Sequence, residues 1–243
     1  MNTCLRKLNS MKAKEISKRL QKLGNKEDAR FLQRFFKTSA GQYGEGDIFL
    51  GIRVPALRNL AEEYNALPLE EVLSLLQSSY HEARLFALIL FVNAFAQGDE
   101  TIQKKIYDLY MANTRHINNW DLVDISAPNI VGAFLMERSK KPLYQLAKSK
   151  SLWERRIAVL ATFSFIRSNK FADTLKIAGI LLRDKEDLIH KAVGWMLREI
   201  GKRDIECAES FLQKQCPVMP RTMLRYAIER FPPAKRRKYL EGG

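Results

Sequence analysis

The fold is decided by the stretch LWERRIAVL at residues 152–160, because similar stretches recur along the chain. Residues 80–88 read YHEARLFAL, and residues 188–195 read LIHKAVGW. In each case a short polar turn leads into an apolar helix, and a leucine-rich helix precedes the turn. Three such stretches in one chain indicate a structural repeat.

The spacing of the stretches gives the repeat its period. Aligning Arg84, Arg156 and Lys191 leaves room for one more unit halfway between the first two, where Trp120 stands at another expected helix start. The period is then about 36 residues, with a helix pair as the unit, which is typical of HEAT-like solenoids. Strand-like alternation is nearly absent, so we predict an all-α superhelix. Equivalent repeat positions line one concave wall, so we expect these four residues along a basic groove.

We expect one helical-repeat domain over residues 1–243. Basic helices at 1–37 precede a glycine-rich loop at 38–47, the repeats occupy 54–231, and a basic tail follows at 232–243. The loop has no Lys-Ser/Thr pair after its glycines and no strand before it, so a phosphate cradle is the weaker interpretation. We interpret it as a connector or an ordered surface loop.

The composition limits the classes of protein. There are 41 Lys and Arg residues against 27 Asp and Glu, a net charge of +14, and 46% of the residues are hydrophobic. Such a chain buries a core and is not disordered. The 3 cysteines cannot all pair and show no metal-ligand spacing, which favours a reducing compartment. No apolar run approaches the roughly 20 residues of a membrane span, and no signal core is present.

These properties predict a cytoplasmic protein with a polyanionic partner, nucleic acid before a membrane surface. The first helices are basic, and their apolar face (Ile16, Leu20, Leu23) has no aromatic residue, which favours packing on the repeats over membrane binding. Basic ends together with basic inner positions favour a continuous groove for a nucleic-acid backbone.

One acidic residue lies among the basic repeat positions. Asp124 follows Trp120 by four residues, so both side chains share a helix face. The structural alternative is that the neighbouring Asp121 pairs locally and Trp120 packs between helices. The place of the acid between Arg84 and Arg156 favours a functional role, because a carboxylate in a groove for a polyanion is otherwise unfavourable.

Trp195 is the second aromatic candidate, with core packing as its alternative. Gly194 beside it permits a close approach, although glycine inside a helix costs about 1 kcal/mol. The three histidines suggest neither a triad nor a metal site, and His81, near a helix start, is expected to have a structural role. We expect no nucleophile, no metal and no cofactor.

Four segments, in this order, resemble the bacterial DNA alkylation-repair glycosylases of the AlkD type: IFLGIRVP at 48–55, WDLVD at 120–124, WERRIA at 153–158 and KAVGWMLRE at 191–199. The resemblance runs from about Ala29 to Tyr226. It implies a fold of HEAT-like repeats, in agreement with the period found above. It also implies excision of N3- and N7-alkylated purines from duplex DNA without insertion of the damaged base into a pocket.

The resemblance also implies roles for single residues. The family's catalytic aspartate corresponds to Asp124, its two lesion-flanking tryptophans to Trp120 and Trp195, and its DNA-contacting arginine to Arg156. A tyrosine of the family's N-terminal helices is replaced here by Phe35, and the glycine-rich loop is absent from the best-known member. Both departures bear on the substrate range.

The repeat register adds Arg84 and Lys191 to Arg156 as phosphate contacts. Hydrolysis of an N-glycosidic bond builds positive charge on the sugar, which one carboxylate can stabilise. A cationic alkylpurine leaves as a neutral base and needs no general acid. We therefore predict a monomeric, metal-free, monofunctional alkylpurine DNA glycosylase that acts on double-stranded DNA without base flipping and is nucleoid-associated when bound. The alternatives are a non-catalytic HEAT-repeat protein that binds duplex or branched DNA, and a scaffold for an acidic protein.

Overall fold

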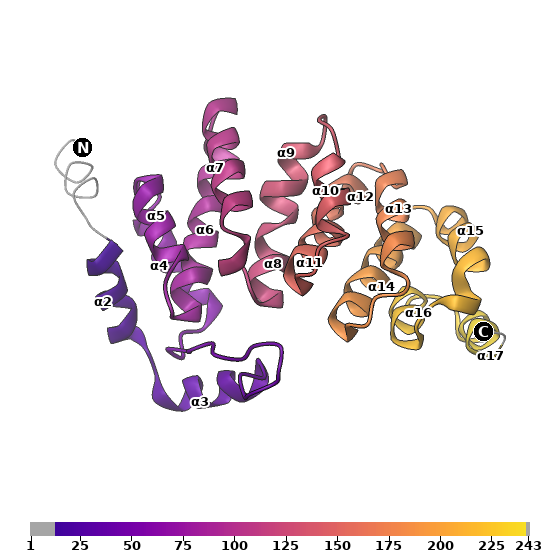
Figure 1. The fold of residues 1–243 in the computed structure, drawn as a ribbon, viewed down its shortest axis with the longest axis horizontal. Coiled ribbons are helices and arrows are strands. Elements are labelled where there is room, and N and C mark those ends of the chain that lie inside the picture. The colour runs from indigo at the N-terminus through magenta and orange to yellow at the C-terminus, as the bar shows by residue number, and fades with distance from the viewer. Residues whose placement is uncertain (1–12, 242–243) are drawn as a thin grey trace. The chain divides into compact units, whose positions relative to one another are not determined.

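The computed structural model describes residues 13–241, which fold almost entirely into helices (Figure 1). Within these residues the only extended pairing is an isolated bridge between Ile48 and Tyr80. The prediction of an all-α fold is therefore confirmed. By internal contacts the chain divides into two compact units, an N-terminal unit of Met1–Ser126 and a C-terminal unit of Ala127–Gly243. That both belong to one domain stays a prediction.

The N-terminal unit is organised around one helix that is buried on nearly all sides. Apart from a 3₁₀ turn at Thr114–His116, its helices are α2 (Ala13–Leu23), α3 (Lys26–Phe35), α4 (Val54–Glu63), α5 (Leu69–Leu76), α6 (His81–Gln97), α7 (Glu100–Ala112) and α8 (Trp120–Ser126). Helix α6 is buried without interruption over residues 81–91, and α4, α5, α7 and α8 pack on it. After its polar first turn the helix is apolar on all sides over residues 85–91, as is typical of a helix in a core.

Helix α2 packs by a narrow apolar stripe. Ile16 and Leu20 are fully buried, and α2 contacts α5. Leu23 at the end of the helix stays 49% exposed. The expectation that this basic helix packs on the repeats is confirmed for the part from Ala13 onward, and Lys12 lies outside the described residues.

The C-terminal unit has α14 as its central helix. It contains a π turn (Pro128–Gly132), a 3₁₀ turn (Cys216–Val218) and the helices α9 (Ala133–Leu135), α10 (Lys141–Leu146), α11 (Leu152–Ala161), α12 (Phe163–Arg167), α13 (Ala172–Leu181), α14 (Asp187–Gly201), α15 (Ile205–Gln215), α16 (Arg221–Ala227) and α17 (Pro233–Glu241). Helices α11, α13, α15 and α16 pack on α14. The basic tail predicted at 232–243 thus contains a helix.

Gly194 lets two helices approach closely, as its sequence context suggests. A Cβ atom at this position would lie 2.5 Å from the carbonyl oxygen of Met223 and 2.5 Å from the Cβ of Tyr226. Both neighbours belong to α16, so glycine is what allows α14 and α16 to pack at this distance.

The repeat is visible in the helix starts. The second helices of the expected pairs, α6, α8, α11 and α14, begin at residues 81, 120, 152 and 187. These are the four places where the sequence pattern predicts a helix start, so the period of about 36 residues marks real structural units.

The glycine-rich loop connects α3 to α4 and is fastened to the start of α6. The backbone N–H of His81 donates to the carbonyl of Ile48 at 2.9 Å. The Glu82 carboxylate accepts three bonds of 2.8–3.2 Å from successive backbone N–H groups, those of Leu50, Gly51 and Ile52. Gly51 has φ +84° and a Cβ there would lie 2.1 Å from the Asn25 carbonyl oxygen, so only glycine fits. The loop is an ordered connector.

Candidate functional site

The candidate acid and tryptophan lie together on α8. Trp120 is the first residue of the helix and Asp124 the fifth, so they share one face, and both are half-buried. The Asn119 side chain accepts a 2.9 Å bond from the Trp120 N–H and fixes the helix start. Burial raises the pKa of Tyr110, and the nearby charge of Asp124 adds to this rise. The predicted pair is thus brought together inside the N-terminal unit.

Aromatic side chains from the end of α3 cover part of Trp120. The ring of Phe36, which is buried, stacks on the indole at 5.1 Å between centroids and 17° between planes. Phe35 meets the indole edge-on at 6.1 Å and is 54% exposed. The residue that replaces the tyrosine expected from the resemblance therefore lies directly beside the candidate site.

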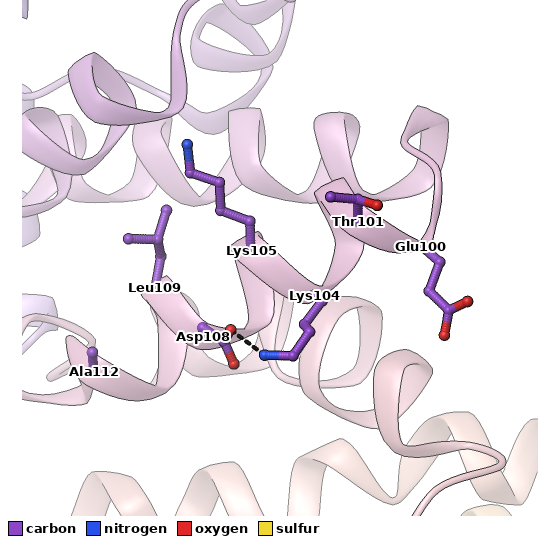
Figure 2. Close-up of a pocket in the computed structure, with 7 residues that line it drawn as sticks. All are labelled: Glu100, Thr101, Lys104, Lys105, Asp108, Leu109 and Ala112. Atoms are coloured by element: carbon purple, nitrogen blue, oxygen red, sulfur yellow. Dashed lines mark hydrogen bonds and ion pairs between the residues drawn. The ribbon is translucent and has the colours of Figure 1, made fainter.

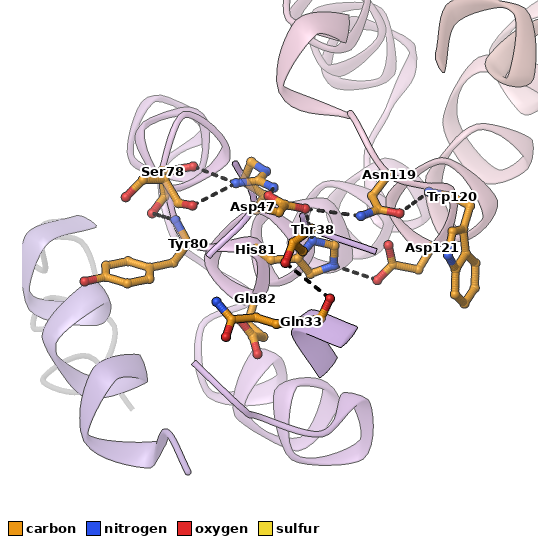
Figure 3. A network of polar contacts seen from close by, with 12 residues as sticks. Gln33, Thr38, Asp47, Ser78, Tyr80, His81, Glu82, Asn119, Trp120 and Asp121 are labelled. Carbon is orange, nitrogen blue, oxygen red and sulfur yellow. Dashed lines mark hydrogen bonds and ion pairs between the residues drawn. The ribbon is translucent and has the colours of Figure 1, made fainter. Parts of the chain in front are cut away.

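A buried histidine links the glycine-rich loop to α8 (Figure 3). His81 is 1% exposed; its Nδ1 lies 2.9 Å from Asp47 Oδ2 and its Nε2 lies 2.8 Å from Asp121 Oδ2. Phe49 stacks on the imidazole at 4.3 Å. The amide of Asn119 donates to the same Asp47 oxygen at 3.2 Å. The loop, the start of α6 and the start of α8 are thereby held by one polar network.

The network carries compensating charges. Burial lowers the pKa of His81, but the charges and hydrogen bonds of Asp121 and Asp47 outweigh burial and raise it to about 9. Burial raises the pKa of Asp47, while the His81 ring and the Arg84 guanidinium outweigh this and lower it. At neutral pH the imidazolium therefore donates to a carboxylate from each ring nitrogen.

Arg84 belongs to this network and corrects the sequence analysis. Its guanidinium is paired with Asp47, and its Nη1 donates to the carbonyls of Ser78 at 3.0 Å and Ser79 at 3.2 Å. The residue is 4% exposed, so it does not offer a phosphate contact on an open wall as predicted. Its physical role is to neutralise the Asp47 carboxylate and to hydrogen-bond the backbone carbonyls of the turn before α6.

The same position in later repeats explains why Arg84 is buried. Arg84, Arg155 and His190 are each the fourth residue of a helix, in α6, α11 and α14. Arg155 donates to the carbonyls of Ser149 and Lys150, and His190 Nε2 lies 2.6 Å from the carbonyl oxygen of Asp184. Side chains tilt toward the start of their helix, so this position faces the preceding turn. The equivalent of Arg84 is therefore Arg155, and aligning Arg84 with Arg156 was wrong by one residue.

The other predicted residues lie in the C-terminal unit. Arg156 is 5% exposed and donates from Nη1 to the Leu188 carbonyl at 2.6 Å. Lys191 pairs with Asp187 at 2.7 Å, and its side chain is 40% exposed. Trp195 is half-buried, and its Nε1 donates to the Glu199 carboxylate at 3.2 Å.

Comparison with known proteins identifies the family. The family of DNA alkylation repair enzymes matches residues 16–231, nearly the whole chain. The chain belongs to this family. The match includes both units and every candidate residue named above.

Solved structures agree with the family in fold. A structure described as a predicted DNA alkylation repair enzyme from Enterococcus faecalis has a TM-score of 0.66 at 18% identity, with 86% of this chain and 97% of that chain covered. AlkD2 from Streptococcus mutans has a TM-score of 0.52 at 19% identity, with 91% and 99% covered. No curated protein matches the chain. At these identities the structures support the helical-repeat fold.

Figure 2 shows a hollow whose lining residues are not those of the candidate site. It measures about 680 Å³ and is lined by α7 alone, where Lys104 pairs with Asp108. None of the predicted site residues lines it. Within residues 13–241 there is no cluster of His, Cys, Asp and Glu that could hold a metal ion, and none of the described helices has the length and apolarity to cross a membrane.

Two residues of the network were not identified as a site from the sequence. The sequence predicts a structural role for His81 but does not indicate its partners, and it shows Asp47 only as the last residue of the loop. Asp47 is 34 residues from His81, and His81 is 40 residues from Asp121, so no short-range spacing relates them. The sequence feature that could indicate the network is the charged helix start from His81 to Arg84, which stands before a long apolar run.

Proposed function

We propose that this protein is a DNA glycosylase that hydrolyses the N-glycosidic bond of cationic N3- and N7-alkylated purines in duplex DNA, without base flipping. One observation carries the proposal. A half-buried carboxylate, Asp124, shares a helix face with Trp120 in a chain that belongs to the DNA alkylation repair enzymes.

The residue types suit the chemistry of this reaction. Positive charge develops on the deoxyribose as the bond breaks, and the Asp124 carboxylate stabilises it and orients the attacking water. The leaving base is already cationic, so it departs neutral without a general acid. One carboxylate is then sufficient, and no Schiff-base lysine is assigned, so strand cleavage is not expected.

Contacts around the start of α8 hold Trp120 and the neighbouring Asp121 in place. The ring of Phe36 supports one face of Trp120, and Asp121, the next residue, is bonded to His81. Catalytic groups act best when neighbouring contacts fix their rotamers before the substrate binds. The indole can then attract the sugar C–H groups and the cationic base.

Residues of the C-terminal unit are proposed as DNA contacts. The family resemblance assigns Trp195 to the lesion and Arg156 to the DNA, and the exposed side chain of Lys191 suits a phosphate. Arg156 is as buried as Arg84, 5% against 4% exposed, and is proposed on the resemblance alone. Arg84 was supported only by the repeat register and is paired with Asp47, so it is not proposed as a DNA contact.

The test is the release of 7-methylguanine and 3-methyladenine from alkylated duplex DNA. The wild type is expected to release at least one of them, and Asp124→Asn and Trp120→Ala to lose most of this activity while still binding DNA. Absence of release by the wild type, with tight binding to duplex or branched DNA, would overturn the proposal in favour of a non-catalytic DNA-binding protein. The replacement of a tyrosine by Phe35, which has no hydroxyl group, is the observation that keeps this second function under test.

A further inference from the structure

Helix α3 presents an apolar face that the N-terminal unit covers only in part, at the Phe35 end, where the ring meets Trp120. None of its residues is buried, although its sequence is strongly amphipathic. Phe31 and Phe35 are 57% and 54% exposed, and their rings stack at 6.1 Å between centroids with 15° between planes. Figure 1 shows α3 at the edge of its unit, below α4 and α6 in this view. An amphipathic helix normally buries its apolar face, so this face is available to a partner.

The neighbouring face of α3 is cationic. Arg30 and Arg34 are one helical turn apart, both are exposed, and neither forms an ion pair among the described residues. They line a hollow of about 490 Å³ together with Gln33, Thr38 and Ser39. The N–H and the hydroxyl of Thr38 both donate to the Gln33 carbonyl, at 3.2 Å each. That carbonyl at the helix end is thus satisfied, and the hollow offers guanidinium donors to an anion.

The two faces form one strip that leads away from the candidate site. Phe35 contacts Trp120 edge-on at 6.1 Å, Phe31 stacks on Phe35, and the arginines follow roughly 100° around the helix. A flat apolar ring beside an anion hollow matches the two parts of a nucleotide, its base and its phosphate. In an intact duplex the bases are stacked on one another, so exposed phenylalanine faces suit only a base that lies outside the stack.

We propose that α3 is a binding site for an unpaired nucleotide of DNA, with its base on Phe31 and Phe35 and its phosphate in the hollow between Arg30 and Arg34. The inference rests on the proposed function only in taking DNA as the partner. It gives the protein a preference for DNA that already contains an unpaired nucleotide. That nucleotide is distinct from the damaged one, which is excised without base flipping in the function proposed above.

The experiment measures binding of the full chain to undamaged, fluorescein-labelled DNA by anisotropy. The probes are an intact duplex and the same duplex with one unpaired thymidine. The wild type is expected to bind the second about tenfold more tightly, as one stacked base contributes. Phe31→Ala should remove this preference and Phe31→Trp should keep it. Arg30→Gln and Arg34→Gln should each weaken binding of the bulged duplex. Each should also lower the slope of log K against log salt concentration by about 1 in magnitude, because one phosphate contact is lost.

Two variants serve as controls. Arg58→Gln removes an exposed arginine of α4, and Leu23→Ala removes an exposed apolar side chain of α2; neither should change the preference. Equal binding of both probes by the wild type overturns the proposal, as does a preference that survives Phe31→Ala and Arg34→Gln. Self-association that is abolished by Phe31→Ala, with DNA binding unchanged, assigns the face to a protein partner and also overturns it. Because the probes are undamaged, the result does not depend on base release and separates this proposal from the glycosylase activity.

Discussion

The starts of α6 and α11 are built alike but used differently. Each helix follows a polar turn and has an arginine as its fourth residue, Arg84 in α6 and Arg155 in α11. Each arginine donates to two carbonyls of the turn before its helix. The other guanidinium nitrogens of the two arginines pair with different acids. Arg155 pairs at 2.6 Å with Asp184, in the turn before α14, whereas Arg84 pairs with Asp47 of the glycine-rich loop.

The first residue of each helix adds a second difference between the starts of α6 and α11. It is Leu152 in α11, which adds no polar contact, and His81 in α6, which connects Asp47 to Asp121. In the C-terminal unit the arginine therefore ties one repeat to the next. In the N-terminal unit the same repeat position, with an added loop and a histidine, fixes the helix that carries Trp120 and Asp124. The arginine contact that joins neighbouring repeats in the C-terminal unit therefore supports the candidate site in the N-terminal unit.

The largest expected effect distinguishes Asp124, the candidate catalytic residue, from Asp184, which pairs with Arg155. Asp124→Asn should lower the rate of base release by at least about 100-fold, as loss of transition-state charge stabilisation does in enzymes. Its melting temperature should change little. Asp184→Asn should show the opposite pattern, because Asp184 neutralises Arg155 and contacts no substrate in our proposal. Single-turnover release of 7-methylguanine and thermal unfolding measure the two quantities, and a rate loss shared equally by both variants would contradict the distinction.

Removal of His81 tests the network of the N-terminal unit. His81→Leu leaves Asp47 and Asp121 without their shared cation, and breaking a buried ion pair costs about 3–5 kcal/mol of unfolding free energy. Arg155→Met should cost less, because its side chain is 16% exposed and water can replace part of the interaction. Urea unfolding followed by circular dichroism compares them. Equal losses would mean that the two helix starts are supported equally.

The pH dependence of stability should follow His81. Its pKa is raised from 6.5 to about 9 on folding, so its contribution is complete below pH 6.5 and is lost as the pH rises through 9. The shift corresponds to about 3 kcal/mol. The groups that face the imidazole are Asp47, Asp121 and, through Asp47, Arg84. Urea unfolding between pH 6 and pH 10 should show this decline in the wild type, and a decline of the same size in His81→Gln would exclude His81 as its source.

The smallest expected effect concerns apolar packing in the C-terminal unit. Gly194→Val places side-chain atoms against α16, where even a Cβ would lie 2.5 Å from the Met223 carbonyl oxygen, and should cost about 2 kcal/mol by overpacking. Gly179→Val is the matched control, because a Cβ at Gly179 in α13 meets no atom within 4 Å. Thermal unfolding measures both, and equal destabilisation would show that helix propensity rather than packing is the cause.

The sequence by itself determined the helical repeat, its period, the four helix starts, the family, and the pairing of Trp120 with Asp124 on one helix face. All of these depend on residues close together in the chain, where helix geometry fixes which side chains are neighbours. The register of Arg84 failed by one residue, because a charge pattern does not tell which of two adjacent arginines, 155 or 156, faces the preceding turn.

The tertiary structure alone decided the contacts between distant segments. It brought Asp47, His81 and Asp121 together across separations of 34 and 40 residues, and it buried Arg84, which the sequence placed on an open wall. It also left Phe31 and Phe35 exposed, although an amphipathic pattern predicts burial. The reason is physical. Local periodicity specifies which face of a helix is apolar or charged, but what meets that face depends on loops and packing that no local pattern records.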